Sequence, residues 1–187
     1  MRNLEQELRK FTKELEKAKA KGEIEGYTLI GALAVSARAK PRATKDIDFL
    51  VSADKSFFQE YFPAIIKSKG YKFKIFKSEP QDPISGLLRI YDKENVELVD
   101  IIPVFWKWQE EIIKNTEILN IYKNFSIPVA RTEDLIILKL KAGGPQDIID
   151  AEELLKSTNK SLDKERLSEL AKRAGVNRQL KMILKEG

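Results

Sequence analysis

The segment that most constrains the fold is Asp46-Ile-Asp-Phe-Leu-Val51, in which two carboxylates alternate with apolar residues before the segment becomes wholly apolar. Side chains two residues apart point to the same side of a β-strand. Asp46 and Asp48 therefore share one face, and the apolar residues between and after them share the other. We expect a strand of a sheet, buried on its apolar face, with two carboxylates side by side.

The rest of the chain divides into a strand-rich part and a helical part. Short apolar or alternating runs predict strands at 27–30, 71–76, 87–91 and 96–102, the last two forming a hairpin, with a further extended pair within 117–129. Helical spacing predicts helices at 3–20, 31–36, 54–69, 105–114, 132–142, 146–157, 162–174 and 177–185, and the stretch 78–83 is predicted to be a loop. We expect a mixed α/β (α+β) fold, with a mixed sheet flanked by helices in residues 1–130 and a C-terminal helical region, 131–187, packed on it.

The composition restricts the chemistry that this chain can perform. Its 187 residues contain no Cys and no His. This excludes disulfides, thiolate nucleophiles, imidazole bases and Ser-His-Asp triads, so that catalysis must use carboxylates, Lys, Arg, hydroxyls or bound hard cations. No apolar run approaches the roughly 20 residues of a membrane span, and the N-terminal region lacks the apolar core of a signal peptide. We expect a cytoplasmic protein without membrane contact.

A third carboxylate, Asp100, lies within the apolar strand predicted at 96–102. A lone carboxylate in such a strand is costly to bury without a partner or a cation. If this strand lies beside Asp46 and Asp48, three carboxylates converge, and Mg²⁺ or Mn²⁺ would suit their hard oxygen ligands. The alternatives are that the Asp-x-Asp pair is solvated and that Asp100 forms a salt bridge with Arg89 or Lys93.

The spacing of these residues resembles a known signature. The pair Gly31-Ala32, followed after thirteen residues by Asp46-Ile-Asp48 and an apolar strand, resembles the DNA polymerase β-like nucleotidyltransferase superfamily. In that family a Gly-Gly or Gly-Ser turn opens a helix whose backbone N–H groups hold a triphosphate. A third Asp from a later strand completes the metal site, and Asp100 matches it. The resemblance implies that Asp46, Asp48 and Asp100 are catalytic metal ligands.

Two further segments resemble the minimal nucleotidyltransferases and the AbiEii-type toxins of abortive infection. The Arg42-Ala-Thr44-Lys-Asp lead-in matches their Arg-x-Thr-x-Asp pattern, and the region around Lys139 and Asp147 matches a Lys-bearing helix followed by a second helical motif. The resemblance implies that Gly31, Ala32, Arg42, Thr44, Lys139 and Asp147 contribute to the nucleotide site. The chain departs from the family pattern in two places, since Ala32 replaces the second Gly or Ser and Gln146 replaces a basic residue.

The resemblance implies a Mg²⁺-dependent nucleotidyltransferase that transfers a nucleoside monophosphate from an NTP to an acceptor hydroxyl on tRNA, a protein or a small molecule, with an antitoxin as a further partner. Residues 36–77 carry ten Lys or Arg against four Asp or Glu, and this excess of positive charge suits a polyanionic substrate such as RNA. For residues 67–77 the simpler interpretation is a solvated, Lys-rich surface. A catalytically inactive member that binds a nucleotide or a partner protein is the main alternative. A nucleotide-sugar transferase with Mn²⁺ at the Asp-x-Asp pair is another.

Overall fold

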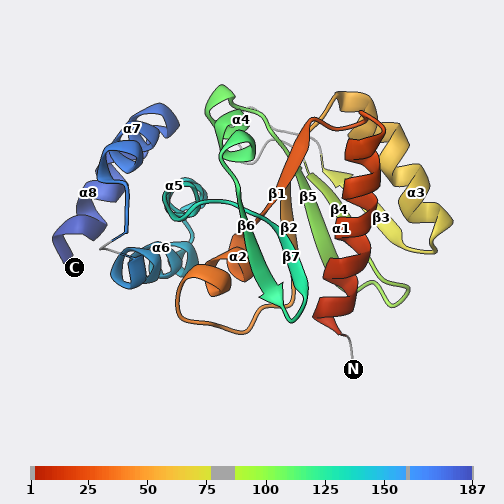
Figure 1. Ribbon diagram of the computed structural model, residues 1–187, viewed down its shortest axis with the longest axis horizontal. Helices are drawn as coiled ribbons and strands as arrows, with labels where there is room; N and C mark the ends of the chain where they lie inside the picture. The colour runs from red at the N-terminus through yellow and green to blue at the C-terminus, as the bar shows by residue number, and fades with distance from the viewer. Residues whose placement is uncertain (1–2, 77–86, 159–160, 187) are drawn as a thin grey trace.

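The computed structural model describes residues 3–76, 87–158 and 161–186, and its centre is a seven-stranded mixed sheet in the order β3-β4-β5-β2-β1-β7-β6 (Figure 1). The strands are β1 (Gly26–Ile30), β2 (Ile47–Ser52), β3 (Lys72–Phe76), β4 (Leu87–Tyr91), β5 (Glu97–Pro103), β6 (Glu117–Tyr122) and β7 (Phe125–Val129). The helices are α1 (Leu4–Ala20), α2 (Gly31–Arg38), α3 (Phe62–Ser68), α4 (Lys107–Lys114), α5 (Thr132–Ala142), α6 (Pro145–Thr158), α7 (Lys164–Ala174) and α8 (Asn177–Glu186), and a π-helical turn, η1 (Phe57–Tyr61), precedes α3. The predicted mixed α/β class is confirmed.

The strand that begins after Asp46 occupies the middle of the sheet. β2 pairs antiparallel with β1 and parallel with β5, and its residues Phe49, Leu50 and Val51 are fully buried. A strand buried on both faces requires a nearly continuous apolar run. This explains why the alternation of polar and apolar residues stops after Asp48.

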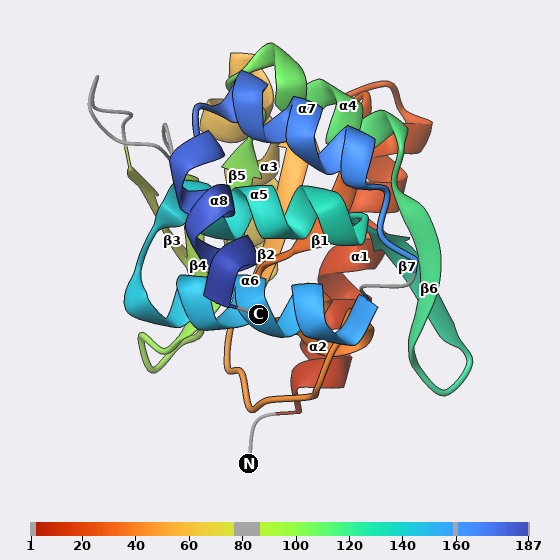
Figure 2. The same cartoon turned by 90° about the vertical axis from the view of Figure 1, so that its left-hand side faces the viewer.

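Helices cover both faces of the sheet. α1 and α3 lie on one side, while α2 and α5 lie on the other, with α6, α7 and α8 outermost (Figures 1 and 2). Helix α5 packs against α2, α6 and α7. The carboxylates of the Asp48 face of β2 therefore lie between the sheet and the C-terminal helices.

Several element boundaries differ from the sequence predictions. The helix expected at 105–114 begins only at Lys107, because the side chain of Gln109 accepts hydrogen bonds from the backbone N–H groups of Phe105 and Trp106 and holds them outside the helix. The helix expected at 162–174 begins at Lys164, because the Asp163 side chain caps it. The extended pair expected within 117–129 is the β6–β7 hairpin. The predicted loop at 78–83 lies outside the described residues.

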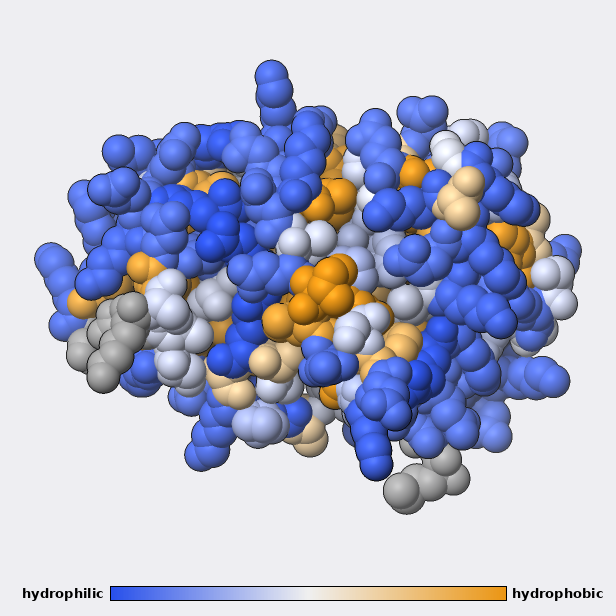
Figure 3. Space-filling model, viewed as in Figure 1, coloured by the Kyte–Doolittle hydropathy of each residue, from blue (hydrophilic) through white to orange (hydrophobic). Residues whose placement is uncertain are grey.

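The surface is mostly hydrophilic. Figure 3 shows polar and charged residues over most of one face, with a hydrophobic cluster near its centre over β6, where Ile118 is 66% exposed. Within residues 3–76, 87–158 and 161–186, no helix combines the length and apolar composition needed to cross a bilayer.

Candidate active site

Gly31 lies directly against Asp48 at the junction of β1 and α2. Helix α2 follows β1 with no intervening residue, and Gly31 adopts a φ of +67°, which side chains other than that of glycine disfavour. A Cβ atom at Gly31 would lie 1.9 Å from Oδ2 of Asp48. The missing side chain thus brings the N-terminus of α2 next to the carboxylate. The first N–H groups of a helix have no partner within it.

Asp48 and Asp100 lie on adjacent parallel strands. The register between β2 and β5 places Asp48 opposite Asp100. On the other side of β5, Arg89 of β4 donates hydrogen bonds to both carboxylate oxygens of Asp100, at 2.8 and 2.7 Å. The structure therefore places Asp100 beside Asp48, as the three-carboxylate hypothesis requires, and it also forms the Arg89 salt bridge that the sequence left open as the alternative.

Asp46 precedes β2 by one residue, so the strand expected at 46–51 is wrong at its start. The hydroxyl of Thr44 donates to the carbonyl of Asp46 and accepts from its N–H, each at 3.4 Å. Such local side-chain hydrogen bonds compete with the strand ladder. Asp46 is exposed, but it lies near enough to raise the pKa of Asp48.

The Asp48 carboxyl has a strongly perturbed pKa. The pKa of Asp48 is raised from an ordinary value of 3.8 to about 7, mainly because the carboxyl is removed from water and secondly because Asp100 is a neighbouring negative charge. The charges of Lys139 and Arg89 act in the opposite direction. Among the described residues, none donates a hydrogen bond to this carboxylate. The charge of Asp48 is therefore only partly compensated, and a cation would stabilise it.

A charge network on the opposite wall centres on Asp150 of α6, which is 2% exposed. Arg42 donates to both oxygens of Asp150 at 2.8 Å. Lys139 of α5 contacts Asp150 at 2.9 Å and Asp147 at 2.7 Å. Burial opposes ionisation of Asp150, but its hydrogen bonds from Arg42, Lys139 and Gln146 outweigh it and lower the pKa to about 2. The network fixes the ammonium group of Lys139, whose side chain is only 13% exposed.

The two departures from the family pattern have different structural roles. Gln146 donates from its side-chain amide to Asp150 at 3.1 Å, so it belongs to the network in which the family pattern has a basic residue. Ala32 is the second residue of α2 and is partly buried. Its methyl group supplies no hydroxyl for a phosphate oxygen.

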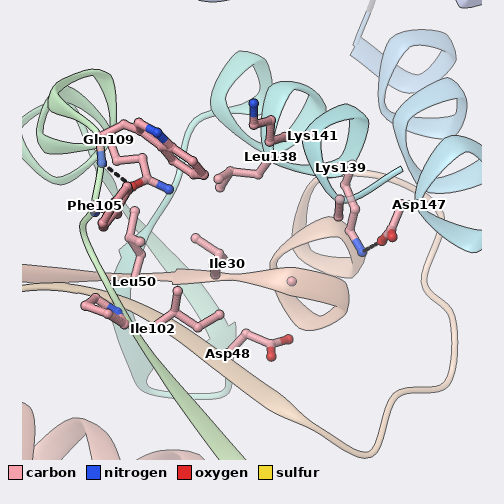
Figure 4. Close-up of a pocket in the computed structure, with 14 residues that line it drawn as sticks. Ile30, Asp48, Leu50, Ile102, Phe105, Gln109, Leu138, Lys139, Lys141 and Asp147 are labelled. Carbon is pink, nitrogen blue, oxygen red and sulfur yellow. Dashed lines mark hydrogen bonds and ion pairs between the residues drawn. The ribbon is translucent and has the colours of Figure 1, made fainter. Parts of the chain in front are cut away.

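A cavity of about 240 Å³ joins these groups. It lies between the sheet and α5, and Gly31, Asp48, Lys139 and Asp147 line one part of it. Figure 4 shows these charged side chains at one end of the cavity and Phe105 at the other. The predicted residues Gly31, Asp48, Lys139 and Asp147 thus line one cavity. Its lining does not include the other predicted site residues, which are Ala32, Arg42, Thr44, Asp46 and Asp100.

The expected three-aspartate metal cradle is not assembled in this structure. In the described part of the chain, no three acidic side chains are arranged so that they could hold a metal ion. Arg89 occupies both oxygens of Asp100, and Asp46 lies exposed before the strand. The chemistry of these side chains still fits a hard cation. Asp48 and Asp100 are adjacent carboxylates of the same charge, and their oxygen atoms are the ligands that such a cation prefers.

Much of the basic segment 36–77 is engaged within the protein. Lys69 lies 3.3 Å from Glu14, Lys72 donates to Asn95 at 2.8 Å, and Arg38 donates to a backbone carbonyl at 2.7 Å. Lys77 lies outside the described residues. These contacts favour the simpler interpretation of 67–77 as a solvated surface.

Sequence reasoning did not assign roles to Asp150, Phe105, Trp106 or Gln109. Asp150 follows Asp147 by three residues on the same helix, which places both on one face of α6. That spacing was the available signal for Asp150. Phe105 and Trp106 lie at a turn that precedes α4, and Gln109, in the first turn of α4, holds it through side-chain hydrogen bonds that no periodic pattern marks.

Comparison with known proteins identifies the family of the chain. Residues 15–186 match the family described as nucleotidyl transferase AbiEii toxin, type IV toxin–antitoxin system. No curated protein matches the chain. The solution structure of the antibiotic-resistance factor ANT(2'')-Ia is similar, with 15% identity over 92% of each chain and a TM-score of 0.51. The lincosamide antibiotic adenylyltransferase LnuA, bound to lincomycin, shares 21% identity over 80% of this chain and 95% of its own, with a TM-score of 0.49. At these identities the structural likeness concerns the fold. Because the family model spans nearly the whole chain, the protein belongs to the AbiEii family and is a nucleotidyltransferase.

Proposed function

We propose that this enzyme transfers a nucleoside monophosphate from a Mg²⁺-bound NTP to an acceptor hydroxyl, using the carboxylates around Asp48. The observation that carries the proposal is the contact between Gly31 and Asp48. It sets the N-terminus of α2 beside a carboxylate whose neighbour across the strands is Asp100. Helix N-termini bind phosphate, and paired carboxylates bind the cation that accompanies it.

In the proposed reaction the acceptor oxygen attacks the α-phosphorus, the bond to pyrophosphate breaks, and the acceptor proton passes to the carboxylate of Asp100. Asp46, Asp48 and Asp100 would hold the Mg²⁺, which would neutralise the negative charge of the phosphates. The backbone N–H groups that begin α2 at Gly31 and Ala32 would bind phosphate oxygens. Lys139, held in place by Asp150, would supply a positive charge on the opposite side of the cavity.

The salt bridge between Arg89 and Asp100 must open before Asp100 can ligate a cation. Both side chains are largely shielded from water, at 27% and 15% exposure. Asp100 could then exchange the guanidinium for the metal. Arg89 would be free to pair with Glu97, which already lies 3.0 Å from it.

We further propose that the enzyme acts as the toxin of a toxin–antitoxin pair. The support is the description of the family to which the chain belongs. The acceptor is RNA, a protein or a small molecule.

A transfer assay tests the proposal. The protein is incubated with each α-labelled NTP, Mg²⁺ and total RNA, and transfer of label is compared between the wild type, Asp48→Asn and the exposed control Glu60→Gln. We expect transfer that Asp48→Asn reduces at least a hundredfold and that Glu60→Gln leaves unchanged. Transfer that survives in Asp48→Asn would contradict the assigned role of this carboxylate. Nucleotide binding without transfer by the wild type to RNA, protein or small-molecule acceptors would favour a binding role.

A further inference from the structure

The end of the cavity away from Asp48 has an aromatic wall. Phe105 is 60% exposed and meets Trp106 edge to face, with ring centroids 5.2 Å apart. Trp106 stacks in turn on the buried Trp108, at 6.0 Å and an interplanar angle of 13°. The wall is therefore anchored in the core, although its outer ring faces solvent and the cavity.

Gln109 adds a hydrogen-bond donor with a fixed direction. Its Oε1 accepts from the backbone N–H groups of Phe105 and Trp106, at 2.8 and 3.0 Å. An amide that accepts twice through its oxygen must direct its NH₂ group the other way. Figure 4 shows this nitrogen on the side of the cavity, and no described residue accepts from it.

The surface between the aromatic wall and the carboxylates is apolar. Leu50 and Ile102 follow Asp48 and Asp100 by two residues on the same strand faces, and both line the cavity. Leu138 of α5 faces them from the other side (Figure 4). One continuous surface thus runs from the charged end to the aromatic end.

We infer that the aromatic end binds a nucleobase, with its ring against Phe105 and Trp106 and an acceptor atom of its edge on the Gln109 amide. A nucleobase has a planar face for the ring contact and a polar edge for the donor. An unsaturated planar ring with acceptor atoms on its edge uses both features, whereas an aliphatic acceptor would use the donor but not the ring. The inference rests on the proposed function. The base belongs either to the NTP or to the terminal nucleotide of an RNA acceptor.

Substitutions at Phe105 test the ring contact. Because Phe105 is mostly exposed, its replacement should leave the fold intact. Affinities for each Mg·NTP and for Mg·tripolyphosphate are measured by calorimetry for the wild type, Phe105→Ala, Phe105→Leu and Phe105→Tyr. If the base is that of the NTP, the Ala and Leu variants bind NTP about tenfold more weakly, the Tyr variant binds within about twofold of the wild type, and tripolyphosphate affinity is unchanged.

If the base belongs to the acceptor, NTP affinity stays constant in all three variants. The KM for the RNA acceptor then rises about tenfold in Phe105→Ala and Phe105→Leu but not in Phe105→Tyr. A Leu variant that matches the wild type in both assays would show that apolar contact alone suffices and would overturn the inference. Wild-type behaviour of all three variants would overturn it as well.

The Gln109→Glu variant tests the polar edge. Glutamate keeps an oxygen that accepts from Phe105 and Trp106 but replaces the NH₂ donor with a second acceptor. We expect the preference among the four bases to change at least tenfold. A ratio among bases is used because the added negative charge weakens all four alike. An unchanged ratio would refute the role of Gln109.

The inference and the proposed function can fail separately. Free nucleosides carry the base without phosphate or metal, and saturation-transfer NMR detects their contact with the protein. If the wild type gives no transfer reaction but nucleoside signals appear and disappear in Phe105→Ala, the proposed function fails and the base site stands. If nucleotide transfer depends on Asp48 but substitutions at Phe105 change neither the binding of nucleosides and NTP nor the KM for the RNA acceptor, the base site fails and the proposed function stands.

Discussion

Replacing Asp48 with Asn should stabilise the fold while abolishing transfer. The pKa of Asp48 is raised from 3.8 to about 7 by its removal from water and by the charge of Asp100. An acid with a raised pKa favours the folded state only while protonated, so its contribution is fully present below pH 3.8 and is lost as the pH rises through 7. At about 1.4 kcal/mol for each unit, the ionised carboxylate costs the folded protein up to about 4 kcal/mol.

The measurement is urea unfolding of the wild type and Asp48→Asn from pH 4 to pH 8.5. Asn has a similar shape and no charge, so the wild type should lose stability relative to the variant as the pH rises, by up to about 4 kcal/mol in total. The exposed Glu60→Gln variant should show no such trend, because Glu60 lies on the surface. A difference between the wild type and Asp48→Asn that is constant with pH would refute the burial of a partly compensated charge at this position.

Three further substitutions test the surroundings of this carboxylate. Gly31→Ala should lower the free energy of unfolding by at least about 1 kcal/mol in urea titrations, because the left-handed backbone disfavours a side chain. It should also reduce nucleotide transfer more than a hundredfold, because the new methyl group would displace Asp48. Transfer within twofold of the wild type would contradict the close contact. Asp150→Ala should lower the free energy of unfolding by about 3 kcal/mol, because it leaves the largely buried Lys139 and the half-buried Arg42 without their shared partner. An unchanged unfolding midpoint would rule out the network. Arg89→Gln should tighten Mn²⁺ binding severalfold in calorimetry, because it releases Asp100; weaker binding would show that the salt bridge supports the site.

The sequence pattern predicted the fold class and the position of most elements because hydrophobic periodicity reflects burial. It predicted a strand beginning at the Asp-x-Asp pair and a second carboxylate-bearing strand around Asp100. It could not predict the strand order, which sets Asp48 opposite Asp100. Strand order depends on connections and on packing between distant segments, and a local pattern does not record them. The sequence analysis therefore stated the adjacency of the two strands only as a condition for a metal site.

The parts of the site that escaped prediction depend on single tertiary contacts. Phe105 fits a helical pattern with the residues after it, and only the side-chain oxygen of Gln109 holds it outside α4. Asp150 shares a helix face with Asp147, but its pairing with Arg42, more than a hundred residues earlier in the chain, is a tertiary contact that this spacing does not record. The Arg89 salt bridge was foreseen only as an alternative to metal binding, because a sequence does not rank two partners for one carboxylate.

The central claim is that Asp48 is the carboxylate at which the metal–nucleotide complex binds. Electron paramagnetic resonance of Mn²⁺ tests it directly, in the presence of an NTP analogue whose α–β bridge cannot be cleaved. We predict that the wild type and Glu60→Gln bind Mn²⁺ in a nucleotide-dependent manner and that Asp48→Asn binds it at least tenfold more weakly. Equal binding by Asp48→Asn and the wild type would contradict the account.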